Sequence, residues 1–356
     1  MSARSWSKFA TPAFWAVLLT LVGMELLIRF TMVDFFSGRY QYGFDQDSGF
    51  VETDRSVQFV RAGGRRFYEQ HMLREKPAAT FRIITVGDSI ARGASLEEAY
   101  PAILGEQMRA RGFRVESINL AVPGFGARRQ QLVLRRALQY SPDLVIFHFG
   151  MSNEFEDERD WGRAQQANSQ HPRDWARRSY LIARLHEYKS EQITPKLLPE
   201  NIRLQSALSD AEDEASANRD PARVAAWRRS FAQIFGESLQ ALQVARIPVL
   251  MIPRVQVLGD GRVSAYDDSG LRQLLGEYLG NRVFWLDPAN LFGPLADREL
   301  FAKDRVHWHP PAHRIAAHAL ADRLAGGSST AQVAGLPNTD FPNADLTAAL
   351  HKAKFD

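Results

Sequence analysis

The stretch Arg82-Ile83-Ile84-Thr85-Val86-Gly87-Asp88-Ser89 decides the class of fold. Its β-branched, apolar residues predict a buried strand that ends at Gly87, and the polar residues after it predict a loop that leads into a helix. Similar apolar runs recur along the chain with helical patterns between them, which is typical of parallel strands covered by helices on both faces. We therefore expect an α/β protein, a three-layer α/β/α sandwich around a five-stranded parallel sheet. The expected strands are 82–86, 115–120, 143–149, 248–252 and 283–286, with helices at 97–112, 128–140, 221–244, 269–279 and 311–324.

The composition excludes several classes of protein. Of the 356 residues, 45% are hydrophobic and 24% are charged, as in ordinary globular proteins, so wholesale disorder and fibrous repeats are excluded. A net charge of +3 gives no electrostatic footprint for nucleic acid, so we expect no nucleic-acid partner. Arginine pairs such as Arg128-Arg129 are interspersed with acids and are interpreted as solvated helix faces. Cysteine is absent, which excludes disulfides, thiolate catalysis and cysteine-ligated zinc.

The N-terminus carries an apolar stretch from Phe9 to Ile28 that is broken by one charge, Glu25. Twenty helical residues rise about 30 Å, the thickness of a bilayer core. No small-residue cleavage pattern follows the stretch, which favours an uncleaved anchor over a signal peptide. Arg4 and Lys8 favour a cytoplasmic N-terminus, so we expect a single-pass protein of a bacterial inner membrane with its bulk in the periplasm. The alternative is a buried amphipathic helix of a soluble protein.

The texture of the remaining sequence indicates how the chain is divided. A glycine pair, Gly63-Gly64, lies between two β-rich runs and predicts a tight hairpin turn. A polar, charged segment interrupts the strand–helix alternation and is too long for an ordinary connection, so it is interpreted as an insertion or lid. The expected parts are a cytoplasmic N-terminus (1–8), the anchor (9–30), a juxtamembrane hairpin segment (31–78), the main domain (79–326, with the insertion at about 154–218) and a loose tail (327–356).

Polar residues and glycines that suit catalysis stand where the predicted strands end. Ser89 follows the first strand, Gly124 the second and Asn153 the third, while Asp304 and His307 precede the last helix. The carboxyl ends of parallel strands meet at one edge of the sheet, which is where ligands bind in such folds. A carboxylate three residues before a histidine can fix its tautomer, so that the ring serves as a base. Each of these features alone is more often structural, as a turn, a cap or a solvated side chain.

Taken together, these blocks resemble the SGNH hydrolases, also called GDSL-type esterases and lipases. The resemblance runs from about Phe81 to Leu324 and implies a flavodoxin-like sheet. It also implies that Ser89 is the nucleophile and His307 the base, oriented by Asp304, with an oxyanion hole formed by Ser89, Gly124 and Asn153. Ile90 replaces the usual leucine after the serine. Trp308 replaces the usual proline after the histidine, which resembles enzymes that handle acetyl groups on bacterial polysaccharides.

The resemblance therefore predicts a serine esterase or O-acyltransferase that acts on an acyl ester, expected to be an acetyl ester, of a small molecule or an extracytoplasmic polysaccharide. A non-catalytic accessory protein that binds glycans or envelope assembly partners is the alternative. His307, His309, His313 and His318 raise the question of a metal site, but metal sites usually add carboxylates in the same cluster, and the last two histidines fall on different faces of the final helix. No metal and no cofactor are expected.

Overall fold

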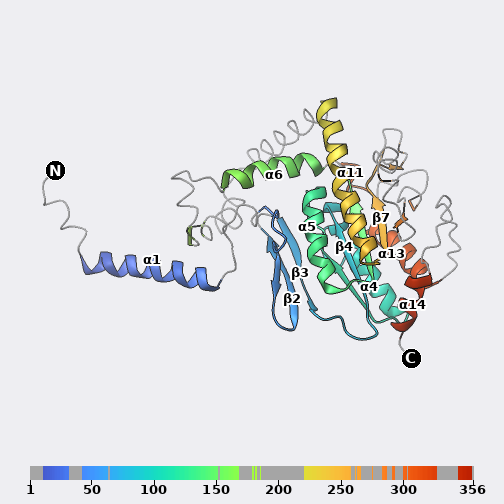
Figure 1. Cartoon of the computed structure of the whole chain (residues 1–356), viewed down its shortest axis with the longest axis horizontal. Helices are drawn as coiled ribbons and strands as arrows, with labels where there is room; N and C mark the ends of the chain where they lie inside the picture. The colour runs from blue at the N-terminus through green and yellow to red at the C-terminus, as the bar shows by residue number, and fades with distance from the viewer. Residues whose placement is uncertain are drawn as a thin grey trace.

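Figure 1 shows the computed structural model of the chain. The structure describes residues 11–31, 42–62, 65–150, 153–167, 179, 181–182, 185, 220–257, 261, 263–265, 275, 283–286, 291–292, 300–302, 304–326 and 344–354. Most of the predicted insertion at 154–218 and most of the predicted helix at 269–279 therefore lie outside the described residues, as do Met151 and Ser152.

The centre of the molecule is a five-stranded sheet in the order β10-β7-β6-β4-β5, with every neighbouring pair parallel. This confirms the predicted sheet, and the order is the flavodoxin-like one, in which the chain reverses direction along the sheet beside the first strand. In the middle of the sheet, Gly87 of β4 is in register with His148 of β6. The strands are β4 (Phe81–Gly87), β5 (Val115–Asn119), β6 (Leu144–Phe149), β7 (Val249–Pro253) and β10 (Val283–Trp285).

Helices cover both faces of the sheet, because alternate residues of each strand enter two separate hydrophobic cores. In β6, Leu144 and Ile146 belong to one core while Val145 and Phe147 belong to the other. The first core is closed by α4 (Tyr100–Ala110), α13 (Pro310–Leu324) and α14 (Ala344–Lys352), and the second by α5 (Ala127–Ala137) and α11 (Pro221–Val244).

A small antiparallel sheet packs into the second core beside α5. Its strands are β1 (Phe50–Glu52), β2 (Ser56–Ala62) and β3 (Arg65–Leu73), in that order. Phe50, Phe59 and Phe67 stack edge to face within 6.4 Å of one another, and the Phe50 ring also stacks on that of Tyr140 at 6.3 Å, which joins this sheet to the domain. The shorter elements are α3 (Ser89–Arg92), η2 (Leu138–Tyr140), α6 (Glu154–Ala167), β8 (Val255–Val257) and β9 (Val263–Ala265).

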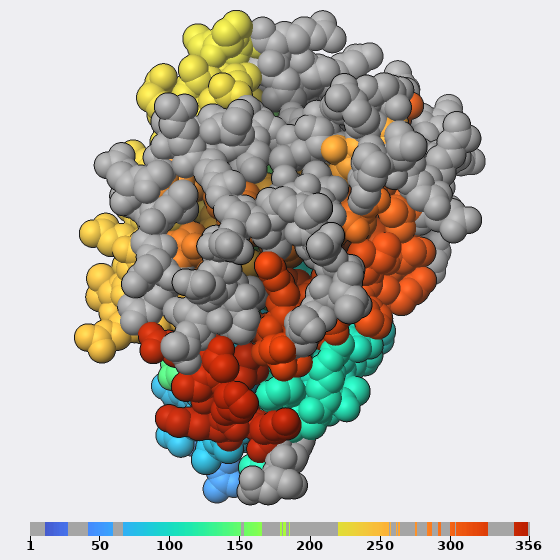
Figure 2. Space-filling model, turned by 90° about the vertical axis from the view of Figure 1, so that its right-hand side faces the viewer, coloured from blue at the N-terminus to red at the C-terminus, as the bar shows by residue number. Residues whose placement is uncertain are grey.

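The structure of the C-terminal tail differs from what the sequence suggested. Residues 327–356 were expected to be loose, but α14 packs against the first core through Leu346 and Leu350, which are buried. The chain after it is also fixed, since Arg114 N–H donates to the carbonyl of Ala353 at 2.7 Å. Figure 2 shows α14, in red, on the surface beside α4, in teal, and α13, in orange. The spacing of the two leucines, four residues apart, places both on one helix face.

The N-terminal helix α1 (Pro12–Thr31) lies beside the sandwich rather than within it (Figure 1). Its apolar side chains are exposed, with Leu19 at 67% and Leu27 at 65% of full accessibility. Glu25 accepts hydrogen bonds from the Ser179 hydroxyl at 2.7 Å and from the Leu181 N–H at 2.9 Å. The predicted transmembrane span, 9–30, starts outside the described residues. Across the described parts of the chain, no helix combines the length and the apolar character needed to cross a membrane.

Candidate active site

Three side chains are joined by hydrogen bonds, one from near the start of the domain sequence and two from near its end. We call these residues, Ser89, His307 and Asp304, the relay. The Ser89 Oγ lies 2.7 Å from His307 Nε2, and His307 Nδ1 lies 2.5 Å from Asp304 Oδ2. The serine is the first residue of α3 and is separated from β4 only by Asp88, and the histidine lies three residues before α13. The structure thus brings together the predicted nucleophile, base and orienting carboxylate, in the order that a serine–histidine–aspartate mechanism requires.

The turn from Asp304 to His307 sets the direction of the imidazole. Asp304 Oδ1 accepts the backbone N–H groups of Val306 at 2.9 Å and His307 at 3.0 Å, which leaves Oδ2 for the ring. Arg305 has a φ of +61°, which tightens this turn. Burial alone would raise the pKa of Asp304, but the hydrogen bonds from His307 and Val306 outweigh it and lower the pKa. Asp304 is therefore ionised near neutral pH, where its negative charge can stabilise a protonated His307 ring.

Of the two further oxyanion candidates, Gly124 lies on the loop between β5 and α5 and Asn153 lies directly before α6. Gly124 has a φ of +69°, a backbone conformation that residues other than glycine rarely adopt. Asn153 is buried and donates Nδ2–H to Asp88 Oδ2 at 2.9 Å. Its Nδ2 is also 3.5 Å from the carbonyl of Phe125, which is too long for a strong hydrogen bond. One N–H of Asn153 is thus held by Asp88, and the other is bound only weakly.

Sequence reasoning missed the acidic and basic residues that hold these loops. Asp88 is fully buried and caps α3 by accepting the Ile90 N–H at 2.9 Å, a role that its position before a helix could have revealed. Arg129, which was expected to be solvated, is fully buried and paired with Asp157 and Asp160. Burial, assisted by the neighbouring Asp157, raises the pKa of Glu154 to about 8.

An aromatic and histidine cluster packs under the relay. Trp308 is buried, and its ring lies 5.0 Å from that of His148 and 6.0 Å from that of Tyr100. Burial lowers the pKa of His148 to about 4 and that of His313 to about 3, so both rings are neutral near pH 7. His309 is exposed at the N-cap of α13. No group of three metal-ligating side chains occurs among the residues that the structure describes.

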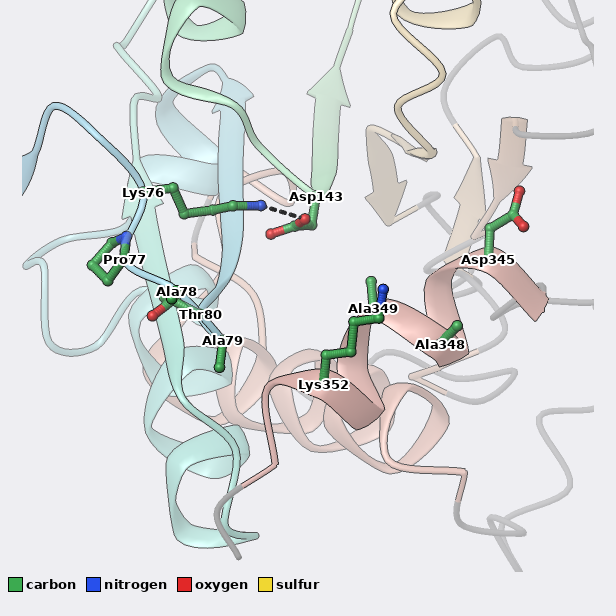
Figure 3. Close-up of a pocket in the computed structure, with 10 residues that line it drawn as sticks. All are labelled: Lys76, Pro77, Ala78, Ala79, Thr80, Asp143, Asp345, Ala348, Ala349 and Lys352. Carbon is green, nitrogen blue, oxygen red and sulfur yellow. Dashed lines mark hydrogen bonds and ion pairs between the residues drawn. The ribbon is translucent and has the colours of Figure 1, made fainter.

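A separate pocket of about 450 Å³ opens at the opposite end of the sheet (Figure 3). Lys76 and Asp143 form an ion pair of 2.6 Å in its wall, next to Thr80 at the start of β4. Lys352 and Asp345 of α14 line its other side. Because Ser89 follows the carboxyl end of β4 and this pocket adjoins the amino end, the pocket is not part of the relay.

Comparisons with known proteins give one match in sequence and several in structure. The family model described as "GDSL-like Lipase/Acylhydrolase family" matches residues 85–315. No curated protein matches the chain in sequence. Similar solved structures include that titled "Crystal Structure of TesA", with 12% identity and a TM-score of 0.38, which covers 68% of this chain and 98% of that one. The acetyl xylan esterase AlAXEase has 16% identity and a TM-score of 0.37, with 67% and 98% covered.

A catalytic mutant of Axe2, an acetylxylan esterase from Geobacillus stearothermophilus, has 13% identity and a TM-score of 0.34, with 67% of this chain and 92% of that chain covered. Identities and TM-scores this low say nothing about the substrate of the present chain. The family match is the stronger result, because residues 85–315 contain Ser89, Gly124, Asn153, Asp304 and His307.

Proposed function

Since the chain belongs to the GDSL-like lipase/acylhydrolase family, we propose that it is a serine esterase in which Ser89 attacks the carbonyl carbon of an acyl ester. The observation that carries the proposal is the relay itself, with Ser89 Oγ 2.7 Å from His307 Nε2 and His307 Nδ1 2.5 Å from Asp304. A protein that only binds ligands has no need of a nucleophile, a base and an orienting carboxylate in line.

In the first half of the reaction, a bond forms between Ser89 Oγ and the carbonyl carbon while the hydroxyl proton moves to His307 Nε2. Asp304, held ionised by the hydrogen bonds that it accepts, stabilises the imidazolium. Negative charge develops on the former carbonyl oxygen. We assign its stabilisation to the N–H groups of Ser89 and Gly124 and to the weakly bound N–H of Asn153.

In the second half, the tetrahedral intermediate collapses and the alcohol leaves with the proton that His307 holds. An acyl group then remains on Ser89. A water molecule in a hydrolase, or a sugar hydroxyl in a transferase, gives its proton to His307 and attacks the acyl carbon. The bond from this carbon to Ser89 Oγ then breaks, and Ser89 takes the proton back from His307. Both outcomes use the same residues, so the acceptor decides between hydrolysis and transfer.

The proposed substrate is an acetyl ester on a carbohydrate outside the cytoplasm. Trp308 follows the base His307, and a tryptophan at this position resembles the sequence of enzymes that handle acetyl groups on bacterial polysaccharides. This resemblance supports acetyl as the acyl group of the substrate. The apolar stretch from Phe9 to Ile28 and the exposed apolar side chains of α1 support an N-terminal anchor in a bacterial inner membrane. With Arg4 and Lys8 on the cytoplasmic side, the catalytic domain would lie in the periplasm.

An ester panel tests the proposal. Purified protein is incubated with soluble esters from acetyl to long acyl, with and without carbohydrate acceptors, and labelled in parallel with a fluorophosphonate probe. We expect turnover of short esters and labelling of Ser89, with Ser89→Ala as the unlabelled control. Transfer to an added sugar would identify a transferase. A folded protein that is neither labelled nor active on any ester would instead favour a non-catalytic accessory protein that binds glycans or envelope assembly partners.

A further inference from the structure

The loop that carries Gly124 is pressed against the acidic face of α6. The Gly126 N–H donates to Asp157 Oδ1 at 2.9 Å, and the Ala127 N–H donates to Glu154 Oε1 at 2.7 Å. A Cβ placed on Gly126 would come within 2.7 Å of Asp157, so only glycine allows this approach. The backbone of the loop is therefore fixed from one side by the carboxyl groups of Asp157 and Glu154.

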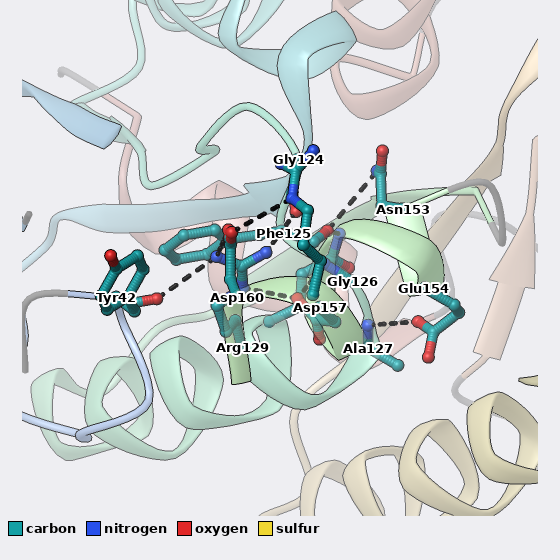
Figure 4. Close-up of polar contacts among 12 residues, drawn as sticks. Tyr42, Gly124, Phe125, Gly126, Ala127, Arg129, Asn153, Glu154, Asp157 and Asp160 are labelled. Atoms are coloured by element: carbon teal, nitrogen blue, oxygen red, sulfur yellow. Dashed lines mark hydrogen bonds and ion pairs between the residues drawn. The ribbon is translucent and has the colours of Figure 1, made fainter. Parts of the chain in front are cut away.

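Arg129 of α5 fixes the same loop from the other side. Its Nη2 donates to the carbonyl of Gly124 at 2.6 Å, and its Nε donates to Asp157 Oδ1 at 2.5 Å. Nη1 donates to Asp160 Oδ2 at 3.0 Å and to the carbonyl of Tyr42 at 3.2 Å. Figure 4 shows the guanidinium between Gly124, Asp157 and Asp160. One side chain thus joins the loop, the helix α6 and the chain at Tyr42.

The surroundings of Arg129 leave the guanidinium no freedom to move. Its side chain is fully buried, and its plane lies against two aromatic rings, 4.5 Å from that of Phe125 and 5.1 Å from that of Phe44. A buried arginine has a rigid fork of donors, and an unpaired buried charge is strongly unfavourable, so the arrangement holds as a unit. A lysine could satisfy only part of this set.

The charge of Arg129 is balanced locally. Asp157 and Asp160 pair with it directly, and Asp160 is also 3.5 Å from Arg159 and 3.4 Å from Arg163. The contribution that the contacts of Arg129 support is geometric, because fixing the Gly124 carbonyl limits the rotation of a glycine whose backbone is otherwise the most permissive.

We propose that Arg129, held by Asp157 and Asp160, is the positioning residue of the oxyanion hole and acts through the Gly124 carbonyl to aim the Gly124 N–H. The inference rests on the proposed function, since it assigns the Gly124 N–H to the oxyanion. The Gly124 N–H has to point at the former carbonyl oxygen only when negative charge develops on it. The loss of Arg129 should therefore destabilise the transition state and lower kcat, with little effect on substrate binding.

The first test compares steady-state kinetics of Arg129→Lys and Asp157→Asn with the wild type on a soluble short ester. We expect kcat to fall about 10²-fold for Arg129→Lys, the low end of what losing one oxyanion donor costs, with KM changed less than about threefold. Asp157→Asn should show the same split with a smaller loss. If Arg129→Lys does not fold, Asp157→Asn still tests the proposal.

A matched control separates positioning from general destabilisation. Arg82 is an equally buried arginine that pairs with Glu116 and binds the carbonyls of Tyr140 and Leu73, away from the Gly124 loop. Arg82→Lys should lower the thermal midpoint but leave kcat within about threefold of wild type. If Arg129→Lys and Asp157→Asn are folded and keep wild-type kcat, the positioning role is wrong. If the wild type itself has no esterase activity, the proposed function fails instead.

Chemical rescue gives a second readout. Arg129→Ala leaves a cavity shaped for a guanidinium ion, and guanidinium chloride at about 20 mM is far below the molar concentrations that unfold proteins. We expect it to restore kcat at least about tenfold, while sodium chloride at the same ionic strength does not. Rescue by both salts equally, or by neither in a folded variant, would contradict the positioning role.

Discussion

Asn153 and Asp88 are joined by a buried hydrogen bond of 2.9 Å, from the Asn153 amide to Asp88 Oδ2. The second oxygen of Asp88 accepts the Ile90 N–H at the start of the nucleophile helix. One carboxylate therefore joins the start of α3, which carries Ser89, to Asn153 at the start of α6. The nucleophile and one oxyanion donor are placed by the same side chain.

Asp88→Asn should lower kcat by about 10- to 100-fold, because it replaces a buried charged hydrogen bond with two facing amide groups. Steady-state kinetics on a short ester measures the loss. Asp143→Asn is the control, since Asp143 pairs with Lys76 and the Arg82 N–H at the far end of the sheet. An Asp88→Asn variant with unchanged kcat would show that the bond has no part in catalysis.

Ser89→Ala should remove at least about 10³-fold of ester turnover. The thermal midpoint should remain nearly unchanged, because the substitution removes one hydroxyl on a helix end. Activity and thermal unfolding are measured on the same preparation. Retention of more than about a tenth of the activity would overturn the assignment of the nucleophile.

Two neighbouring histidines should differ sharply. His307→Ala should be as damaging as Ser89→Ala, and the double variant little worse than either, because the pair acts as a unit. His309 is exposed at the N-cap of α13, so His309→Ala should cost about tenfold or less. Rates of the four proteins on one ester decide the matter. The reverse ranking of the two histidines, in folded variants, would assign the base to His309.

The stability of the protein should depend on pH through Glu154. Its pKa is raised from an ordinary 4.5 to about 8, so the folded protein holds a proton that the unfolded chain releases between those values. Stability should therefore fall as the pH rises through this window. Glu154→Gln keeps an acceptor for the Ala127 N–H but does not titrate.

Urea denaturation of both proteins between pH 5 and pH 8 measures this dependence. The wild type should lose stability relative to Glu154→Gln as the pH rises, with the difference levelling off near the upper value. Parallel pH profiles for the two proteins would mean that Glu154 ionises normally.

Removal of residues 1–33 should yield a soluble enzyme that still hydrolyses a small ester, since all the candidate site residues lie after Phe81. Detergent-free purification and the ester assay test this. A reporter fused after Asp356 should be active only in the periplasm. Reporter activity in the cytoplasm would reverse the proposed orientation, and a folded but inactive truncation would place the N-terminus in the site.

The strands of the sheet could be predicted from the sequence, because an apolar run is a local signal, and so is a carboxylate three residues before a histidine. Ser89 was joined to Asp304 and His307 by the family resemblance, since no local pattern connects residues 218 positions apart. Arg129 could not be found in this way. A buried arginine and a solvated one look alike in a helix, and its carboxylate partners come 28 and 31 residues later in the chain.

The helix α14 was missed for a different reason. Its apolar spacing was present in Leu346 and Leu350, but the surrounding tail is rich in alanine, asparagine and other small or polar residues that suggest a loose segment. Only the core that Leu346 and Leu350 share with α4 and α13 shows where the helix docks. Burial against distant elements decides such cases, and a single sequence does not carry it.

The hydrogen bond between Ser89 and His307 joins residues that are 218 positions apart. A chain emerging from the ribosome has its nucleophile long before its base, so it cannot hydrolyse an ester while most of the domain is still being made. Should translation stop early, the fragment carries an unactivated serine. The chain can therefore become active only after His307 has been synthesised, and turnover marks a chain that extends at least that far.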